Sequence, residues 1–287
     1  EEAAELIERI TKAKGPLPQF TSCCPAWVRY CEIFHPEMIP HISSAKSPIG
    51  MQGPTVKTYF AKKMNLDPKR IVHVAVTPCT AKKAEILREE MNAAGRLLGD
   101  PAMRDTDYVI TTVELADWAK AARINFAELP EGAFDRLMGE GSGAGVIFGV
   151  TGGVTEAVLR RIISDKSAAA LQAIAFKGIR GADGVKEAAV KYGDRELKIA
   201  VVSGLGNAHE LIKRIRNGEH YDFVEVMACP GGCVCGAGQP FVLHEGKESR
   251  GKGLYSADKM SSIKRSEENP LMMALYSGLL KGRVHDL

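Results

Sequence analysis

The chain has 287 residues, 45% of them hydrophobic and 25% charged, and its formal net charge is +3. These values are typical of a globular protein large enough for two lobes. Basic and acidic residues are interspersed, which argues against nucleic-acid binding. No apolar run approaches the roughly 18 residues that cross a bilayer. The chain opens with an acidic amphipathic helix pattern rather than a signal peptide, so we expect a cytoplasmic protein.

Taken in chain order, apolar residues recur with a helical period in segments that alternate with apolar, β-branched runs. The expected helices are 2–13, 26–34, 49–64, 80–94, 112–123, 153–164, 207–217, 257–266 and 270–281. The expected strands are 71–77, 107–112, 145–150, 198–204 and 222–229, with 172–179 as a further candidate. This alternation predicts an α/β fold with two lobes, each a mostly parallel twisted sheet flanked by helices. We place the first lobe at 1–140 and the second at 141–287, with the glycine-rich stretch 139–153 as the seam.

Seven cysteines are present, an odd number, in a chain too large to need disulfide bonds for its stability. This usage favours a reducing compartment with metal or redox chemistry. Cys24 precedes an expected helix, and Cys79 and Cys229 each end an expected strand. Open α/β proteins place their sites at such positions. We therefore expect the three segments to meet in a cleft between the lobes.

The stretch Cys-Pro-Gly-Gly-Cys, from Cys229 to Cys233, adds a second local thiol. Together with Cys24 and Cys79 it gives four thiolates from three loops, a donor set that suits an iron–sulfur cluster or zinc. Two solitary ligands and one local pair favour a cluster, because structural zinc usually takes two local cysteine pairs. Zinc and scattered thiols remain alternatives at this point.

Three segments carry a specific resemblance: TSCCPAW (21–27), TPCTAKKAE (77–85) and EVMACPGGCVCGAGQP (225–240). They resemble the signature segments of the iron-only (FeFe) hydrogenases, in the family's order. The resemblance implies an H-cluster, a 4Fe–4S cubane linked to a diiron unit with CO, cyanide and azadithiolate ligands, and the reversible reduction of protons to H₂. It also implies that these segments and the rest of the chain form one H-cluster domain.

The same resemblance implies roles for individual residues. The cubane ligands would be Cys24, Cys79, Cys229 and Cys233, and Cys233 would also bridge to the diiron unit. Lys82 would hydrogen-bond a cyanide ligand, and Thr77, Met227 and Phe148 would lie near the diiron unit. For protons, Cys23 would face the dithiolate amine, and Glu2, Glu5 and Arg9 would continue the route on the first helix. Ser44 would be the relay hydroxyl between Cys23 and Glu2.

Several positions depart from the family's usual pattern and indicate a divergent subgroup. Thr77 stands where the best-known members have Met, and Cys235 is an extra thiol two residues beyond Cys233. The family usually has further sequence on both sides of this region, so we expect a partial sequence or a second chain that completes the site.

Two other functions fit the same cysteines. One is an iron–sulfur carrier or assembly protein without the diiron unit, and the other is a hydrogen sensor. Retention of Cys23, Lys82 and the Glu2/Glu5 helix favours the enzyme, because a carrier needs no proton relay. The expected partners are ferredoxin or an accessory iron–sulfur domain or subunit as electron donor or acceptor, and maturases that insert the cluster.

Overall fold

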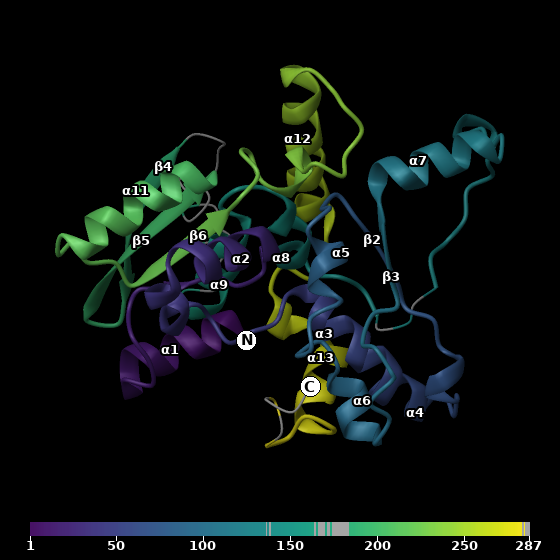
Figure 1. Ribbon diagram of the computed structural model, residues 1–287, viewed down its shortest axis with the longest axis horizontal. Helices are drawn as coiled ribbons and strands as arrows, with labels where there is room; N and C mark the ends of the chain where they lie inside the picture. Colours follow the sequence, from purple (N-terminus) through teal and green to yellow (C-terminus); the bar gives the residue numbers. More distant parts are fainter. Residues whose placement is uncertain are drawn as a thin grey trace. The chain divides into compact units, whose positions relative to one another are not determined.

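The computed structural model describes residues 1–135, 137, 139–163, 165, 170, 173, 184–282 and 284, without the side chains of 244 and 245. These residues form two compact units (Figure 1). Unit 1 comprises residues 1–45, 141–235 and 243–268, and unit 2 comprises 46–140, 236–242 and 269–287. The units are interleaved in the sequence, because the chain passes between them after residues 45, 140, 235, 242 and 268. A division into two lobes at 1–140 and 141–287 stays a prediction.

Unit 1 contains a four-stranded sheet in the order β1-β6-β5-β4. The strands are β1 (Gln19–Phe20), β4 (Val185–Tyr192), β5 (Arg195–Ser203) and β6 (Phe223–Met227). The neighbours of β6 run parallel to it, and β4 joins β5 as an antiparallel edge strand. The parallel core and the strands expected at 198–204 and 222–229 are confirmed. The β4–β5 hairpin was not expected; its two-residue turn uses Gly193 at a φ of +59°.

Side chains alternate between the two faces of the sheet along each strand. Both faces carry buried apolar side chains, and helices cover both. The unit 1 helices are α1 (Glu2–Lys12), α2 (Pro25–Phe34), α8 (Gly143–Val146), α9 (Gly153–Ile162), α11 (Leu205–Arg216) and α12 (His244–Met260). On one face, Ile199 and Phe223 pack with residues of α1 and α9. On the other, Ala200 and Val224 pack with residues of α2 and α11. Figure 1 shows α11 lying along the strands.

The strand expected at 145–150 is wrong. Residues 143–146 form α8, and a 3₁₀ turn follows over Ile147–Gly149. Ser142 caps α8, since its Oγ accepts a hydrogen bond from the Gly145 N–H at 3.2 Å. Ile147 is fully buried, so its apolar character reflects core packing rather than a strand. A short buried apolar run cannot distinguish these two states.

Unit 2 contains a two-stranded parallel sheet, β2 (Val74–Thr77) and β3 (Tyr108–Thr111), as expected. Its helices are α3 (Pro48–Thr55), α4 (Ala61–Lys63), α5 (Lys82–Glu85), α6 (Ala93–Leu98), α7 (Thr112–Ala121) and α13 (Pro270–Ser277). The single helix expected at 80–94 is wrong. The Asp105 carboxylate accepts hydrogen bonds from the Ala93 and Ala94 N–H groups at 2.9 and 2.8 Å, which starts a new helix there.

The helix expected at 257–266 starts earlier, at His244, and ends at Met260. The backbone of the next residue, Ser261, is extended. The candidate strand 172–179 lies outside the described residues, apart from residue 173. In the part of the chain that is described, no helix is long and apolar enough to cross a bilayer.

Candidate metal centre

Three of the four candidate cysteine ligands follow two neighbouring strands of unit 1. The strands β1 and β6 are parallel, and beyond β1 the Thr21 N–H still donates to the Val224 carbonyl at 3.0 Å. The chain leaves β1 at Phe20 and reaches Cys23 and Cys24. It leaves β6 at Met227 and reaches the loop from Cys229 to Cys233. Both cysteine segments therefore start from the same, carboxyl end of the sheet.

Cys24 occupies the N-terminal cap of α2. Its carbonyl accepts the Val28 N–H at 3.1 Å, and Pro25 takes the first helical position. Two residues further, the buried Trp27 donates its indole N–H to the Thr21 carbonyl at 3.1 Å and anchors the turn. The positive end of the helix dipole lies next to Cys24, which favours a thiolate there.

The loop from Cys229 to Cys233 is built on two glycines in left-handed conformations. Gly231 and Gly232 have φ values of 90° and 89°. A Cβ on Gly232 would lie 2.6 Å from the Thr151 backbone nitrogen, so only glycine fits there. The Gly232 N–H donates to the Cys229 carbonyl at 2.9 Å, which closes the turn between the two half-buried cysteines.

Cys79 lies in unit 2, two residues after β2, and is also half-buried. The Gly238 N–H donates to the Pro78 carbonyl at 2.9 Å, which ties residues 236–242 to the Cys79 segment. Within the described residues, no three His, Cys, Asp or Glu side chains are grouped as ligands of a single metal ion. Because Cys79 belongs to the other unit, convergence of the four cysteines on one cluster stays a prediction.

The chemistry of the donor set fits an iron–sulfur cluster. Each cysteine follows a strand of a parallel sheet or caps a helix, where backbone N–H groups and helix dipoles stabilise negative charge. All four are half-buried, unlike Cys31, which is fully buried in the core. Thiolates are the ligands that such clusters require.

Lys82 is buried at the start of α5 and forms an ion pair with the buried Glu85. Its Nζ lies 3.0 and 2.8 Å from the two Glu85 carboxylate oxygens. Ser47 donates its hydroxyl to Glu85 Oε2 at 3.0 Å. The sequence interpretation missed Glu85 and Ser47, although the spacing of three residues between Lys82 and Glu85 is one at which side chains meet on a helix.

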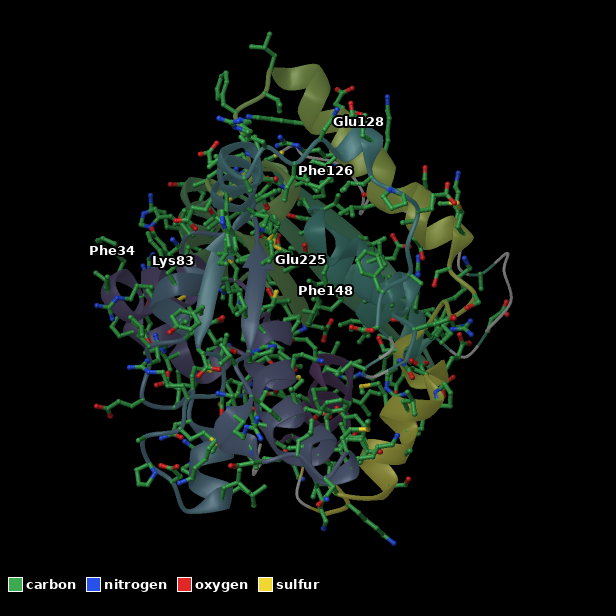
Figure 2. The ribbon with its side chains drawn as sticks, turned by 90° about the vertical axis from the view of Figure 1, so that its right-hand side faces the viewer. Phe34, Lys83, Phe126, Glu128, Phe148 and Glu225 are labelled. Atoms are coloured by element: carbon green, nitrogen blue, oxygen red, sulfur yellow. The ribbon has the colours of Figure 1, made fainter. Side chains whose placement is uncertain are left out.

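The next residue, Lys83, is exposed (Figure 2). It forms an ion pair with Glu114, which is also exposed. Lys82 and Lys83 therefore provide a buried and an exposed version of the same ion pair.

Glu5 on α1 lies at the centre of a hydrogen-bond network. Arg9 donates from Nε and Nη2 to Glu5 Oε1 at 3.1 and 2.6 Å. Glu5 Oε2 accepts from the Ser43 hydroxyl at 2.7 Å and from the Ser44 N–H at 2.9 Å. Burial raises the pKa of Glu5, but the hydrogen bonds from Ser43 and Arg9 outweigh it and leave the pKa below its usual value. Glu5 is therefore an anion at neutral pH.

Glu2, one turn earlier, behaves in the opposite way. Burial and the negative charge of Glu5 raise its pKa to about 8. Hydrogen bonds with Ser43 and Gln19 offset only part of this rise. Glu2 Oε1 is buried and has no hydrogen-bond partner among the described residues. Glu2 is therefore mostly protonated at pH 7, beside a charged Glu5 on the same helix.

Ser44 lies beside Glu5, and its relay position between Cys23 and Glu2 stays a prediction. Ser44 is exposed, and its hydroxyl lies 3.2 Å from Glu5 Oε2. The buried hydroxyl that contacts both carboxylates is that of Ser43, which the sequence interpretation missed. The two serines are adjacent, and only the burial of one of them distinguishes their roles.

The remaining candidates lie at element ends. Thr77 and Met227 are the buried last residues of β2 and β6. Phe148 is half-buried in the turn after α8 (Figure 2). Glu225 in β6 was missed; its carboxylate accepts the Gly152 and Thr155 N–H groups, both at 2.7 Å, and so fixes the start of α9 on the sheet. Burial raises the pKa of Glu225.

Comparison with protein families identifies the chain over nearly its whole length. Residues 1–237 match the family described as "Iron only hydrogenase large subunit, C-terminal domain", and residues 244–287 match "Iron hydrogenase small subunit". The chain is 49% identical to the periplasmic [Fe] hydrogenase large subunit of Nitratidesulfovibrio vulgaris, covering 84% of this chain and 56% of the relative. It is 43% identical to iron hydrogenase 1 of Clostridium pasteurianum, covering 100% of this chain and 50% of the relative. The chain thus spans about half the length of these relatives.

More distant relatives carry other names. A cytosolic Fe-S cluster assembly factor NAR1 from Sclerotinia sclerotiorum is 34% identical, covering 83% of this chain and 48% of the relative. Among solved structures, an apo [FeFe]-hydrogenase HydA1 from Chlamydomonas reinhardtii superposes with a TM-score of 0.78 at 39% identity, covering 98% of this chain and 77% of that one. A HydA structure described for stepwise H-cluster assembly gives a TM-score of 0.81 at 38% identity, covering 100% of this chain and 79% of that one. The chain therefore belongs to the iron-only hydrogenase family.

Proposed function

We propose that this chain is the catalytic domain of a hydrogenase that interconverts protons, electrons and H₂. The observation that carries the proposal is the pair Glu2 and Glu5, whose pKa values are driven apart, on the helix that packs against the cysteine-bearing sheet. A cluster carrier has no use for such a pair. When bound, an H-cluster would supply the redox chemistry, through a 4Fe–4S cubane and a diiron unit with CO, cyanide and azadithiolate ligands.

Four thiolates would hold the cluster: Cys24, Cys79, Cys229 and Cys233. Cys233 would also bridge the cubane to the diiron unit. The left-handed conformations of Gly231 and Gly232 set the geometry between Cys229 and Cys233. Cys24 is held by the start of α2, which leaves the adjacent Cys23 to serve as a proton donor and acceptor.

Protons would pass between Cys23 and solvent along α1. Glu2 holds a proton at neutral pH, and the Ser43 hydroxyl can accept it on one side while it donates its own proton to Glu5. Arg9 keeps Glu5 charged and in place, so that Glu5 is ready to receive the proton. Ser44 supports Glu5 from the exposed side.

Lys82 would donate a hydrogen bond to a cyanide ligand. Glu85 and Ser47 hold it in a buried position, where an ammonium is a strong donor. Thr77, Met227 and Phe148 would line the diiron unit, and the small hydroxyl of Thr77 would leave more room there than a Met. Electrons would come from ferredoxin or an accessory iron–sulfur subunit, and maturases would insert the diiron unit.

A second candidate is an iron–sulfur assembly protein that binds only the cubane, because a relative named as a cytosolic Fe-S cluster assembly factor is 34% identical. The relatives' names include both periplasmic and cytosolic proteins, and a cytoplasmic location remains our prediction.

The deciding experiment separates cubane binding from catalysis. The purified chain is reconstituted with iron and sulfide, then with a synthetic diiron complex, and H₂ production from reduced methyl viologen is measured at each stage. We expect turnover only after the second stage. A complete cubane with no turnover after diiron addition would refute the hydrogenase and favour the carrier. In the active protein, Cys23→Ala should retain its iron and lose turnover by about 100-fold or more.

A further inference from the structure

Glu225 lies in the middle of β6, on the face of the sheet that also carries Phe223 and Met227 (Figure 2). Phe223 packs with residues of α1 and α9 on this face. The Glu225 side chain is fully buried. Burying a carboxyl group is costly unless hydrogen bonds replace its hydration, so the partners of Glu225 indicate what it contributes to the structure.

The partners of Glu225 are backbone N–H groups at the start of α9. Oε1 accepts from the Gly152 N–H and Oε2 accepts from the Thr155 N–H, both at 2.7 Å. The first N–H groups of a helix need an acceptor, which is usually the side chain of the residue before the helix. In α9 that residue is Gly152, which has no side chain to offer and a φ of +88°. Glu225, 70 residues beyond Thr155, takes over this capping role from the sheet.

The turn before α9 is in direct contact with the loop from Cys229 to Cys233. A Cβ on Gly232 would lie only 2.6 Å from the Thr151 backbone nitrogen, so the two backbones touch without a side chain between them. Directly after the loop, the buried Val234 packs with the buried Val150 of the same turn. Because interiors are close-packed, a displacement of the turn would displace the loop.

We propose that Glu225 is a positioning residue for the candidate metal centre and sets the conformation of this cysteine loop through the start of α9. The near end of the loop is held by the chain itself, because Cys229 follows two residues after β6. The far end, beside Cys233, rests on the turn that Glu225 caps. One side chain of β6 therefore fixes how the two cysteines lie relative to each other. The inference rests on the proposed function only in that both cysteines bind a cluster, as they would in a hydrogenase and in a carrier.

Asp222 provides a matched control for a purely structural role. It is buried, directly precedes β6, and accepts a backbone hydrogen bond from the Lys198 N–H at 2.8 Å. It lies at the amino end of β6, whereas the cysteine loop follows the carboxyl end. Removing its charge should lower stability without an effect on the loop.

The first measurement needs no cluster. Hydrogen exchange of the backbone amides is compared in the unchanged 287-residue chain, Glu225→Gln and Asp222→Asn. Gln has nearly the same size as Glu, but its NH₂ group cannot accept a hydrogen bond, so one N–H at the start of α9 loses its acceptor. We expect exchange at residues 149–155 and 231–233 to accelerate by at least about tenfold in Glu225→Gln alone. Acceleration at 149–155 without acceleration at 231–233, or the same acceleration in both variants, would overturn the proposal.

The second measurement uses the cubane as the probe, in chains reconstituted with iron and sulfide. Glu225→Gln should alter the electron paramagnetic resonance spectrum of the reduced cluster and lose iron to a chelator about tenfold faster or more, while Asp222→Asn should do neither. A spectrum that stays the same in Glu225→Gln would contradict the positioning role. If the unchanged chain binds no cubane, the proposed function fails, and the exchange comparison alone decides this inference.

Glu225→Asp covers the case in which Glu225→Gln does not fold. Asp keeps the carboxylate but is shorter by one methylene group, so it cannot reach both N–H groups from β6. It should therefore give the same faster exchange at 231–233. Exchange at these residues equal to that of the unchanged chain would show that the reach of Glu225 does not position the loop.

Discussion

Helices α1 and α5 differ in how many carboxylates are present for each positively charged side chain. On α1 there are two carboxylates, Glu2 and Glu5, and the guanidinium of Arg9 contacts Glu5. The result is one anion and one carboxylic acid with a pKa of about 8. On α5, the one carboxylate of Glu85 pairs with the one ammonium of Lys82. With two carboxyl groups and one cation on α1, one carboxyl group keeps a proton that it can exchange near neutral pH. With one carboxylate and one ammonium on α5, the carboxylate holds the ammonium in place.

Helix α1 belongs to unit 1 and α5 to unit 2. The two kinds of charge pairing therefore serve one site only if the cysteines of both units bind one cluster. Cys24→Ala in unit 1 and Cys79→Ala in unit 2 should each abolish binding of the reconstituted cluster, because a cubane needs four thiolates. Iron content and visible absorbance measure the loss. Cys31→Ala is the control, since Cys31 is fully buried in the core between α2 and the sheet. If Cys79→Ala binds the cluster as well as the unchanged chain, the two units do not share it.

The proton-exchanging role of α1 predicts the next largest effect. Glu2→Gln and Glu5→Gln should each lower H₂ turnover by about 100-fold while iron content stays the same, because each removes a proton-transfer group. Glu8→Gln on the same helix should have little effect, since Glu8 pairs with Lys12 at the surface. A similar loss in all three variants would show that general charge on α1, rather than a specific route, supports turnover.

The fixed charge on α5 can be compared with its exposed neighbour. Glu85→Gln leaves a buried ammonium without its counter-ion and should lower the free energy of unfolding by about 3 kcal/mol. Glu114→Gln removes the partner of the exposed Lys83, and the unfolding midpoint should stay nearly unchanged. Urea unfolding measures both. Equal effects would mean that Lys82 is not held by Glu85.

The pH dependence of stability should have opposite signs for the two α1 carboxylates. Folding raises the pKa of Glu2, so the folded state keeps a proton that the unfolded chain releases above about pH 4.5. Relative to Glu2→Gln, the unchanged chain should therefore lose stability as the pH rises from 5 to 8. Folding lowers the pKa of Glu5, so its contribution is present above pH 4.5 and is lost as the pH falls below it. Unfolding midpoints from about pH 3 to 8 test both signs, and slopes of the same sign would contradict the assigned pKa values.

The sequence was sufficient for β2 and β6, the strands that precede Cys79 and Cys229, because both are apolar runs that end at turn residues. It did not predict β1, the two-residue strand that precedes Cys23 and Cys24. It was not sufficient where tertiary contacts decide local structure. Residues 145–150 are apolar like a strand, but a Ser142 cap makes them helical at their start. Asp105, more than ten residues away, divides the helix expected at 80–94.

The candidate site shows the same limit. The spacing of the cysteines indicated candidate metal ligands, and Lys82 was named because its segment resembles a family signature. Ser43 could not be distinguished from Ser44, since only burial and the contact with Glu5 separate two adjacent serines. The raised pKa of Glu2 depends on its burial and on the charge of Glu5, neither of which a one-dimensional pattern contains.

Infrared spectroscopy of the chain after addition of the diiron complex tests the central claim most directly. If Cys24, Cys79, Cys229 and Cys233 hold an H-cluster, the spectrum should contain CO and cyanide stretching bands, and Cys233→Ala should lose them. A spectrum without these bands, from protein that contains a complete cubane, would contradict the account.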